Sequence, residues 1–164
     1  MALYQLAMRH RSYFQGHRTS KLYNNERLEF LGDSILSSII SDILYRNFPE
    51  RREGELTTMR SKMVQRATLD SLAVNIGLKQ LIQSNDRLLK ASDGHIAGNA
   101  FEALVGAIYL DQGYNVCKHF IEKLIKDKRL DMEQIIRSES NHKSRLIEWT
   151  QRRKVLYRFV HTVE

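Results

Sequence analysis

The chain has 164 residues, of which 42% are hydrophobic and 27% are charged. That length supports one globular domain with a short appendage and leaves little room for a second full domain. The single Cys117 excludes an intrachain disulfide and a multi-cysteine metal cluster, and it fits a reducing, cytoplasmic compartment. No apolar run is long enough to cross a bilayer, and the amino terminus lacks the residue order of a secretory signal, so we expect no membrane partner.

The formal net charge of +7 indicates a surface that attracts polyanions. Basic residues are spread over several segments, whereas acidic residues concentrate in two predicted helices described below. An acidic trough flanked by basic surface can bind RNA at its edges while a metal ion offsets the repulsion at its floor. Charge alone does not establish this function, since many basic proteins bind no nucleic acid.

The spacing of apolar residues predicts an all-α fold. These residues recur mostly at three- and four-residue intervals, and one Pro and eight Gly leave few interruptions. The predicted helices occupy residues 2–13, 25–47, 56–76 (as one or two helices), 78–89, 96–110 and 114–128. Alternation typical of a strand occurs only near the end, in residues 155–163.

Turn signals set the boundaries of these helices. Pro49 ends the second helix, because the residue before a proline disfavours the helical region. We expect a charged turn centred on Gly54, followed by a helix capped by Thr57 or Thr58. Gly77 is well placed to terminate that helix.

Residues 24–36 are the most informative segment, because they set three carboxylates into a helix otherwise patterned for burial. Glu26, Glu29 and Asp33 stand at i, i+3 and i+7, so they project from one stripe. Acidic residues at helical spacing usually form a solvated face. Here the neighbouring apolar residues leave little circumference for water, and a divalent cation would remove the repulsion. An all-oxygen stripe suits Mg²⁺ or Mn²⁺ better than zinc.

The predicted helix at residues 96–110 carries a second polar pair. Asn99 and Glu102 are three residues apart and share a face, which matches the spacing of Glu26 and Glu29. Small residues on this helix permit close helix approach, which would bring Glu102 near the acidic stripe. On spacing alone, ordinary tight packing with Glu102 in solvent is an equal alternative.

Three blocks of the sequence together resemble the ribonuclease III family of double-strand-specific ribonucleases. They are residues 24–36 (NNERLEFLGDSIL), 52–57 (REGELT) and 97–111 (AGNAFEALVGAIYLD), in the family's order. The resemblance runs from about residue 3 to residue 130. It departs from the family pattern at Asn24, where His is usual, and at Asn99, where Asp is usual. We interpret residues 1–138 as a helical ribonuclease III-type nuclease domain.

The resemblance implies an Mg²⁺-dependent endoribonuclease that hydrolyses double-stranded RNA in rRNA and mRNA processing, with Mn²⁺ as a substitute ion. Its products would have 5′-phosphate and 3′-hydroxyl ends with short 3′ overhangs. Two ions about 3.5–4 Å apart can activate a water and stabilise the departing 3′ oxygen. No small-molecule cofactor is expected.

The family's functional positions carry over to single residues of this chain. The metal-ligand positions are matched by Glu29, Asp33, Asn99 and Glu102, of which Asp33 and Glu102 also match catalytic positions. Glu26 and Glu53 match acidic positions that serve in the outer shell or in RNA placement. Because the Asn99 amide brings no negative charge, the site should hold its ions more weakly than one with Asp.

Phe30 lies among the carboxylates, where an aromatic residue usually fills a core. In the family, the matching aromatic residue inserts into a socket on a second subunit. The resemblance therefore implies a homodimer with its two acidic sites at opposite ends of a groove, each cutting one strand.

Residues 139–164 resemble the first helix and first strand of a double-stranded-RNA-binding domain. Ser144, Glu148 and Gln151 match positions that touch the RNA minor groove in such domains. So short a segment buries too little surface to fold in that way by itself, and we expect it to be a truncated start.

Two alternative functions stay open. One is a catalytically weakened or inactive relative that acts as an RNA-binding or structural subunit, which Asn99 and the short tail favour mildly. The retained acidic stripe argues against it, because a pure binding surface gains affinity by losing negative charge near phosphates. The other is a helical metal-binding protein with no RNA partner, which the basic surface and the three ordered blocks disfavour.

Overall fold

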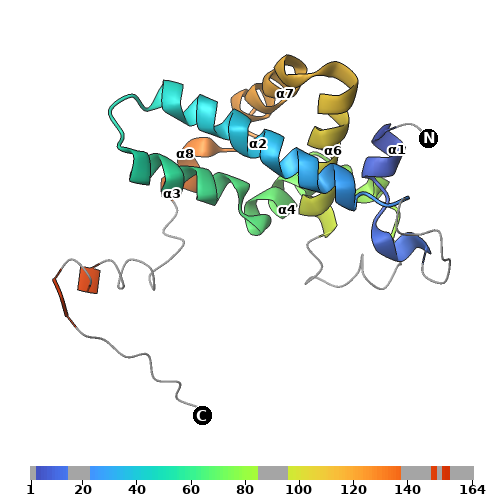
Figure 1. The fold of residues 1–164 in the computed structure, drawn as a ribbon, viewed down its shortest axis with the longest axis horizontal. Coiled ribbons are helices and arrows are strands. Elements are labelled where there is room, and N and C mark those ends of the chain that lie inside the picture. The colour runs from blue at the N-terminus through green and yellow to red at the C-terminus, as the bar shows by residue number, and fades with distance from the viewer. Residues whose placement is uncertain (1–2, 15–22, 85–95, 138–148, 151–152, 156–164) are drawn as a thin grey trace, which may run out of the picture.

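The structure is a computed structural model that describes residues 3–14, 23–84, 96–137, 149–150 and 153–155 (Figure 1). In these ranges the regular structure is helical, and the only β-type pairing there is an isolated parallel bridge between Arg9 and Gln83. The predicted all-α fold is confirmed. No helix within these ranges combines the length and the apolar character that crossing a membrane requires.

Two long helices, α2 (Glu26–Asn47) and α6 (Ile96–Gln112), pack against each other and form the frame of the fold (Figure 1). α2 buries one face only, as expected for an amphipathic helix at the surface. α6 is buried along most of its length, because α1 (Leu3–Ala7), α4 (Arg66–Asn75) and α7 (Tyr114–Lys126) also contact it.

Two glycines let α2 and α6 cross at close range. A Cβ atom on Gly32 would collide with the carbonyl oxygen of Glu102, and one on Gly106 would collide with that of Leu28. Both obstacles are helix backbone, which does not swing aside as a side chain does. The crossing therefore requires glycine at both positions, and it confirms the close approach predicted from the small residues of α6.

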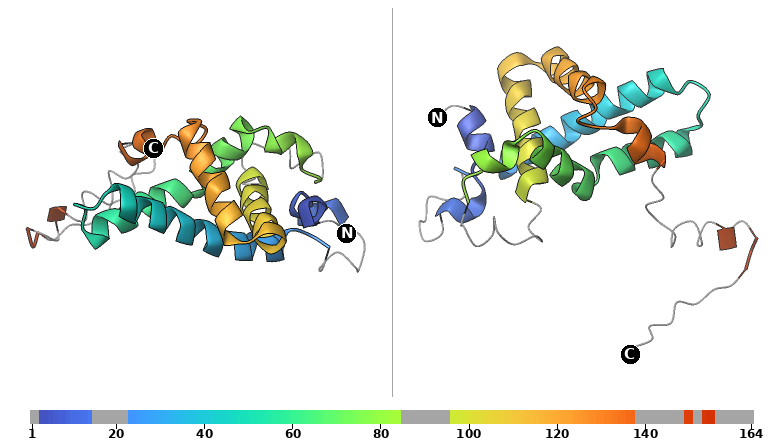
Figure 2. Two further views of the ribbon diagram at one scale, coloured as in Figure 1. Left: turned by 90° about the horizontal axis from the view of Figure 1, so that it is seen from above. Right: turned by 180° about the vertical axis from the view of Figure 1, so that it is seen from behind.

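The remaining helices complete the shell around this frame. α3 (Glu53–Val64) packs along α2, and α8 (Met132–Arg137) packs on α3 (Figure 2). Short 3-10 helices, η1 (Arg11–Phe14) and η3 (Leu78–Leu81), follow α1 and α4. Gly77 separates α4 from η3 with a φ of 77°, as its predicted role at a helix end requires.

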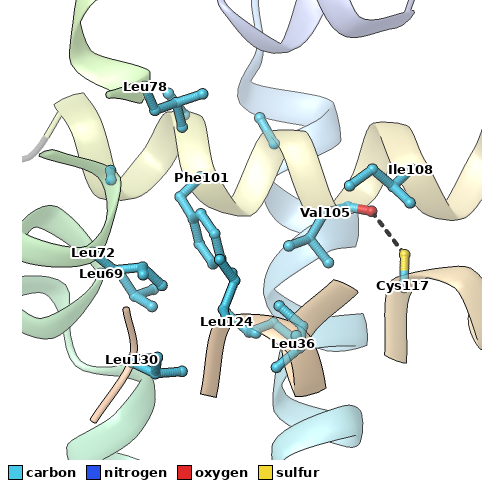
Figure 3. Packing of buried hydrophobic residues seen from close by; sticks show 14 of the residues in the cluster. Leu36, Leu69, Leu72, Leu78, Phe101, Val105, Ile108, Cys117, Leu124 and Leu130 are labelled. Atoms are coloured by element: carbon cyan, nitrogen blue, oxygen red, sulfur yellow. Dashed lines mark hydrogen bonds between the residues drawn. The ribbon is translucent and has the colours of Figure 1, made fainter. Parts of the chain in front are cut away.

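Phe101 of α6 lies at the centre of the hydrophobic core and is fully buried (Figure 3). Its ring projects toward Leu69 and Leu72 of α4 and toward Leu124 of α7. The ring of Phe120 stacks on it with centroids 6.3 Å apart. This packing fixes the position of α6, and hence of the polar residues on its first turns, relative to α4.

Cys117 is a packing residue of the same core. Its thiol is fully buried and donates a hydrogen bond of 3.4 Å to the carbonyl oxygen of Val105 (Figure 3). Burial raises the pKa of the thiol to about 11. The side chain therefore stays a neutral thiol at physiological pH.

The amino-terminal prediction was wrong in part. Residues 2–13 do not form one helix, because α1 ends at Ala7 and the following backbone is extended beside Gln83. The Gln83 N–H donates to the carbonyl oxygen of Met8 at 2.8 Å, and the His10 N–H donates to the carbonyl oxygen of Gln83 at 3.0 Å. This long-range pairing outweighs the local helical pattern.

The start of α3 also differs from the prediction. The helix begins at Glu53, so Gly54 lies inside it and the two threonines are helical rather than capping residues. The carboxylate of Glu55 accepts the Arg52 N–H at 3.1 Å, so the helix is capped at Arg52, five residues before the first of the two expected caps. α8 was not predicted. Of the predicted helix at 78–89, only η3 forms among the described residues; residues 82–84 are not helical, because Gln83 pairs with the backbone at Arg9. Residues 85–89, residues 156–163 of the predicted strand, and Ser144, Glu148 and Gln151 lie outside the described residues.

Candidate functional site

The acidic stripe of α2 faces the first turns of α6 across a single cleft. The cleft has a volume of about 770 Å³. Its walls include six of the residues selected from the sequence: Glu26, Glu29, Phe30, Asp33, Asn99 and Glu102. Glu102 thus faces the acidic stripe, since the Gly32 crossing brings its backbone against α2.

Asp70 of α4 fixes the start of α6. Its Oδ1 atom accepts the Gly98 N–H at 2.7 Å, which satisfies a donor that a helix start leaves without an intrahelical partner. A Cβ on Gly98 would lie 3.0 Å from the same oxygen, so glycine keeps this contact free of crowding. The contact holds Asn99 and Glu102 in place at the cleft.

Asn25 anchors the start of α2. It is buried, its backbone N–H donates to the Arg9 carbonyl oxygen at 2.8 Å, and its side-chain amide donates to the Ala7 carbonyl oxygen at 3.2 Å. Its Oδ1 atom, also buried, has no hydrogen-bond partner among the described residues. The hydrogen bonds to Arg9 and Ala7 hold the start of α2 against the segment that includes the end of α1.

Asn24 orients the first carboxylate of the stripe. The backbone N–H of Glu26 donates to Asn24 Oδ1 at 3.0 Å, and the Asn24 side-chain amide donates to the Glu26 carboxylate at 3.1 Å. Arg11 lies 3.5 Å from the same carboxylate, with both side chains largely exposed. The residue that replaces the usual His of the family pattern therefore has a definite structural role here.

The carboxylates of the cleft act on one another. Burial, followed by the charges of Asp33 and Glu29, raises the pKa of Glu102 to about 7. Burial, followed by the charge of Glu26, raises the pKa of Glu29, and a hydrogen bond from Asn99 opposes this shift. The carboxylates of the cleft are so close together that proton binding by one of them relieves the repulsion. A bound divalent cation would relieve the same repulsion and displace that proton.

The donor set fits a hard divalent cation. Carboxylate and amide oxygens are the ligands that Mg²⁺ and Mn²⁺ prefer, and the described part of the cleft contributes no thiolate. Nowhere in the described ranges do three His, Cys, Asp or Glu side chains already form a group that could hold an ion. The carboxylates therefore line one cleft and interact electrostatically. Their side chains must rotate within the cleft before their oxygens can coordinate one ion.

One sequence candidate, Glu53, lies apart from the carboxylate cluster, and a second, Phe30, lines the cleft as an exposed side chain. Glu53, the first residue of α3, lines a different hollow of about 540 Å³ with residues of the second half of α2, and accepts a hydrogen bond of 3.0 Å from Thr57. Phe30 lies at the cleft, but its side chain is 79% exposed. Phe30 therefore does not fill the core of this chain.

Sequence reasoning missed Arg66 and Asp70. Arg66 lines the cleft, and Asp70 holds its α6 wall through Gly98. Both belong to α4, whose own periodicity says nothing about which helix it packs against. The charge of Arg66 opposes the rise in the pKa of both Glu29 and Glu102, which places its guanidinium within the electrostatic field of these carboxylates.

Comparisons with known proteins agree with the sequence blocks. The Ribonuclease-III-like family model matches residues 1–129. Ribonuclease 3 of Phocaeicola vulgatus is 49% identical over 154 residues, which cover 94% of this chain and 50% of that protein. Ribonuclease 3 of Bacteroides thetaiotaomicron is 50% identical over 153 residues, which cover 93% and 49%. The chain spans about half the length of the curated relatives it matches.

Solved structures share the fold. The nuclease domain of ribonuclease III from Campylobacter jejuni, in which a region involved in dimer formation is flexible, has a TM-score of 0.67 at 30% identity, covering 76% of this chain and 85% of that one. Dicer from Pichia stipitis has a TM-score of 0.62 at 29% identity, covering 91% and 65%. Sequence blocks, cleft and fold agree, and the chain belongs to the ribonuclease-III-like family.

Proposed function

We propose that this chain is the nuclease part of a ribonuclease III, an endoribonuclease that hydrolyses phosphodiester bonds in double-stranded RNA. The observation that carries the proposal is the convergence of Glu29, Asp33 and Glu102 from two helices on one cleft. A cleft with this charge repels RNA unless cations are bound, so its retention favours catalysis over simple binding.

In this proposal Glu29, Asp33, Asn99 and Glu102 hold Mg²⁺, or Mn²⁺ in its place. When bound there, the ions would supply an activated water and stabilise the departing 3′ oxygen, and the products would have 5′-phosphate and 3′-hydroxyl ends. Glu102 holds a proton in part of the molecules near neutral pH and releases it when a cation binds, because its pKa is raised to about 7. Glu26 orients the hydration shell, and Glu53 serves in RNA placement.

The second element of the proposal is a homodimer. Phe30 is a large aromatic residue that is 79% exposed on α2, which is an unfavourable state for a monomer and a favourable one for an interface anchor. A two-fold axis would then pair two identical clefts, one for each strand of the duplex. Offset cuts on the two strands give the short 3′ overhangs.

The remaining elements of the proposal concern the carboxyl-terminal segment and the cellular role. Residues 139–164 begin a double-stranded-RNA-binding domain, in which Ser144, Glu148 and Gln151 contact the minor groove. The buried thiol of Cys117 suits a reducing cytoplasm, and the substrates are rRNA and mRNA precursors.

An incubation with a long RNA duplex tests this function. With Mg²⁺ or Mn²⁺ we expect cleavage to products with 5′-phosphate and 3′-hydroxyl ends, and with a chelator we expect none. Duplex binding without ion-dependent cleavage would instead support a catalytically weakened RNA-binding subunit, the alternative that Asn99 favours. If the chain neither binds nor cleaves the duplex, the nuclease function and the RNA-binding alternative are both overturned.

A further inference from the structure

Arg66 is a cationic side chain at the edge of the carboxylate cluster. It is the first residue of α4, it is exposed, and it lines the cleft with Glu29 and Glu102. Within the described ranges it forms no ion pair, whereas Arg11, the other arginine of the cleft, lies 3.5 Å from Glu26. Among the described residues, the Arg66 guanidinium thus lines the cleft without a hydrogen-bond or ion-pair partner.

The position of Arg66 does not suit a metal-supporting role. Its charge acts on Glu29 and Glu102, the two carboxylates that stand for metal ligands in the proposed function. A positive charge in the same cleft competes electrostatically with a divalent cation for those carboxylates. An anionic group that arrives with the substrate would give this positive charge a partner without competing with the metal ion.

A guanidinium suits such a partner. Its planar fork of N–H donors matches two oxygens of a phosphate, and charge-assisted bonds of this kind are stronger in a partly water-excluded cleft. Because Asn99 adds no charge to the cleft wall, the repulsion that a phosphate meets there is smaller than with a further carboxylate. Gln65 precedes Arg66 at the cleft wall and adds a neutral polar group.

We propose that Arg66 is the phosphate-contacting residue of the acidic cleft, with its guanidinium donating hydrogen bonds to the non-bridging oxygens of the RNA phosphate that enters it. This inference rests on the proposed ribonuclease function. It adds to that function a residue of α4 that holds the substrate rather than the metal, and positions the reacting strand between α2, α4 and α6.

Single-turnover cleavage of a duplex RNA with Mg²⁺, measured over protein and salt concentration, tests this role. Arg66→Ala should weaken the apparent Kd about tenfold, as loss of a charged hydrogen bond does. The slope of log Kd against log salt should fall by about 0.9, the value for one phosphate contact. Arg66→Lys should keep the slope and lose only part of the affinity, because it keeps the charge without the fork.

Two controls separate this role from a general effect. Arg46→Ala removes the same charge from an exposed pair with Asp42, outside the cleft, and should leave Kd and slope unchanged. Binding of Mn²⁺ alone, followed by electron paramagnetic resonance, should be tighter in Arg66→Ala than in the natural chain. Weaker Mn²⁺ binding in that variant would show that Arg66 supports the metal site, and would overturn the inference.

The outcomes also distinguish the two proposals. If the natural chain cleaves duplex RNA and Arg66→Ala has the same Kd and salt slope, the Arg66 inference fails and the nuclease function stands. If the natural chain neither binds nor cleaves duplex RNA, both fail.

Discussion

The Glu102 carboxylate is proposed to be needed for metal binding, but its charge destabilises the fold. Burial and two neighbouring carboxylates raise its pKa from 4.5 to about 7. Between those values the folded chain binds more protons at this group than the unfolded chain, so stability falls as pH rises through the window. At higher pH the fold retains a charge that it would be more stable without.

Glu102→Gln should therefore stabilise the ion-free protein at pH 8, by on the order of 1 kcal/mol given the partial exposure of the group. At pH 4, below the ordinary pKa of 4.5, the effect should nearly vanish, because Glu102 is then largely protonated in both the folded and the unfolded chain. Urea unfolding at both pH values in a chelator measures this difference. Glu50→Gln, an exposed position, should show neither effect.

The same Glu102→Gln variant should lose ion-dependent cleavage while keeping its fold. A variant that is more stable and inactive would identify Glu102 as a functional residue with a stability cost. Equal stability at both pH values would contradict the electrostatic account, and near-normal cleavage would remove the metal role.

Asn99→Asp tests the residue at which the chain departs from the family pattern. A carboxylate adds charge to a hard-cation site, so we expect tighter Mn²⁺ binding by about tenfold. Isothermal titration calorimetry measures the affinity. Asn115→Asp, an exposed site on α7, adds the same charge elsewhere and should leave the affinity unchanged. Equal affinities in both variants would place Asn99 outside the ion's reach.

The crossing of α2 and α6 decides the geometry of the cleft at the scale of elements. Gly32→Ala places a methyl group against the Glu102 carbonyl oxygen, and we expect it to destabilise the fold by about 3 kcal/mol. Gly54→Ala is the matched control, because nothing lies within 4 Å of its Cβ position in α3. That change should stabilise the fold by about 0.5–1 kcal/mol, since alanine is the better helix former.

Urea unfolding of the two glycine variants separates a packing constraint from a helix-propensity effect. We expect Gly32→Ala to lower the free energy of unfolding and Gly54→Ala to raise it. A neutral or stabilising Gly32→Ala would mean that the helices cross less closely than the structure shows, and that Glu102 is not held against α2 by this contact.

The elements that the sequence predicts best are those whose signals are local. The spacing of carboxylates and apolar residues placed α2 between residue 25 and Pro49, and the small residues of α6 predicted its close contact. The break after Ala7 depends on Gln83, far along the chain, and so has no local signal. The Asp70 contact with Gly98 and the place of Arg66 depend on how α4 packs, which no pattern within α4 indicates.

At the scale of the whole molecule, the exposed Phe30 predicts self-association. Phe30→Ala should weaken dimerisation about thirtyfold, as loss of an aromatic anchor at an interface does. Sedimentation equilibrium over a concentration series measures this constant. Leu81→Ala removes another exposed apolar side chain, which is 63% exposed on η3, and should leave the dimer intact. A natural chain that is monomeric at all concentrations would contradict the homodimer.

The central claim is that α2 and α6 together hold a divalent cation with their carboxylates. Anomalous scattering from crystals of this chain grown with Mn²⁺ tests it most directly. We expect a manganese peak within bonding distance of oxygens from Glu29, Asp33 and Glu102. Manganese bound only elsewhere, with this cleft empty at saturating ion, would contradict it.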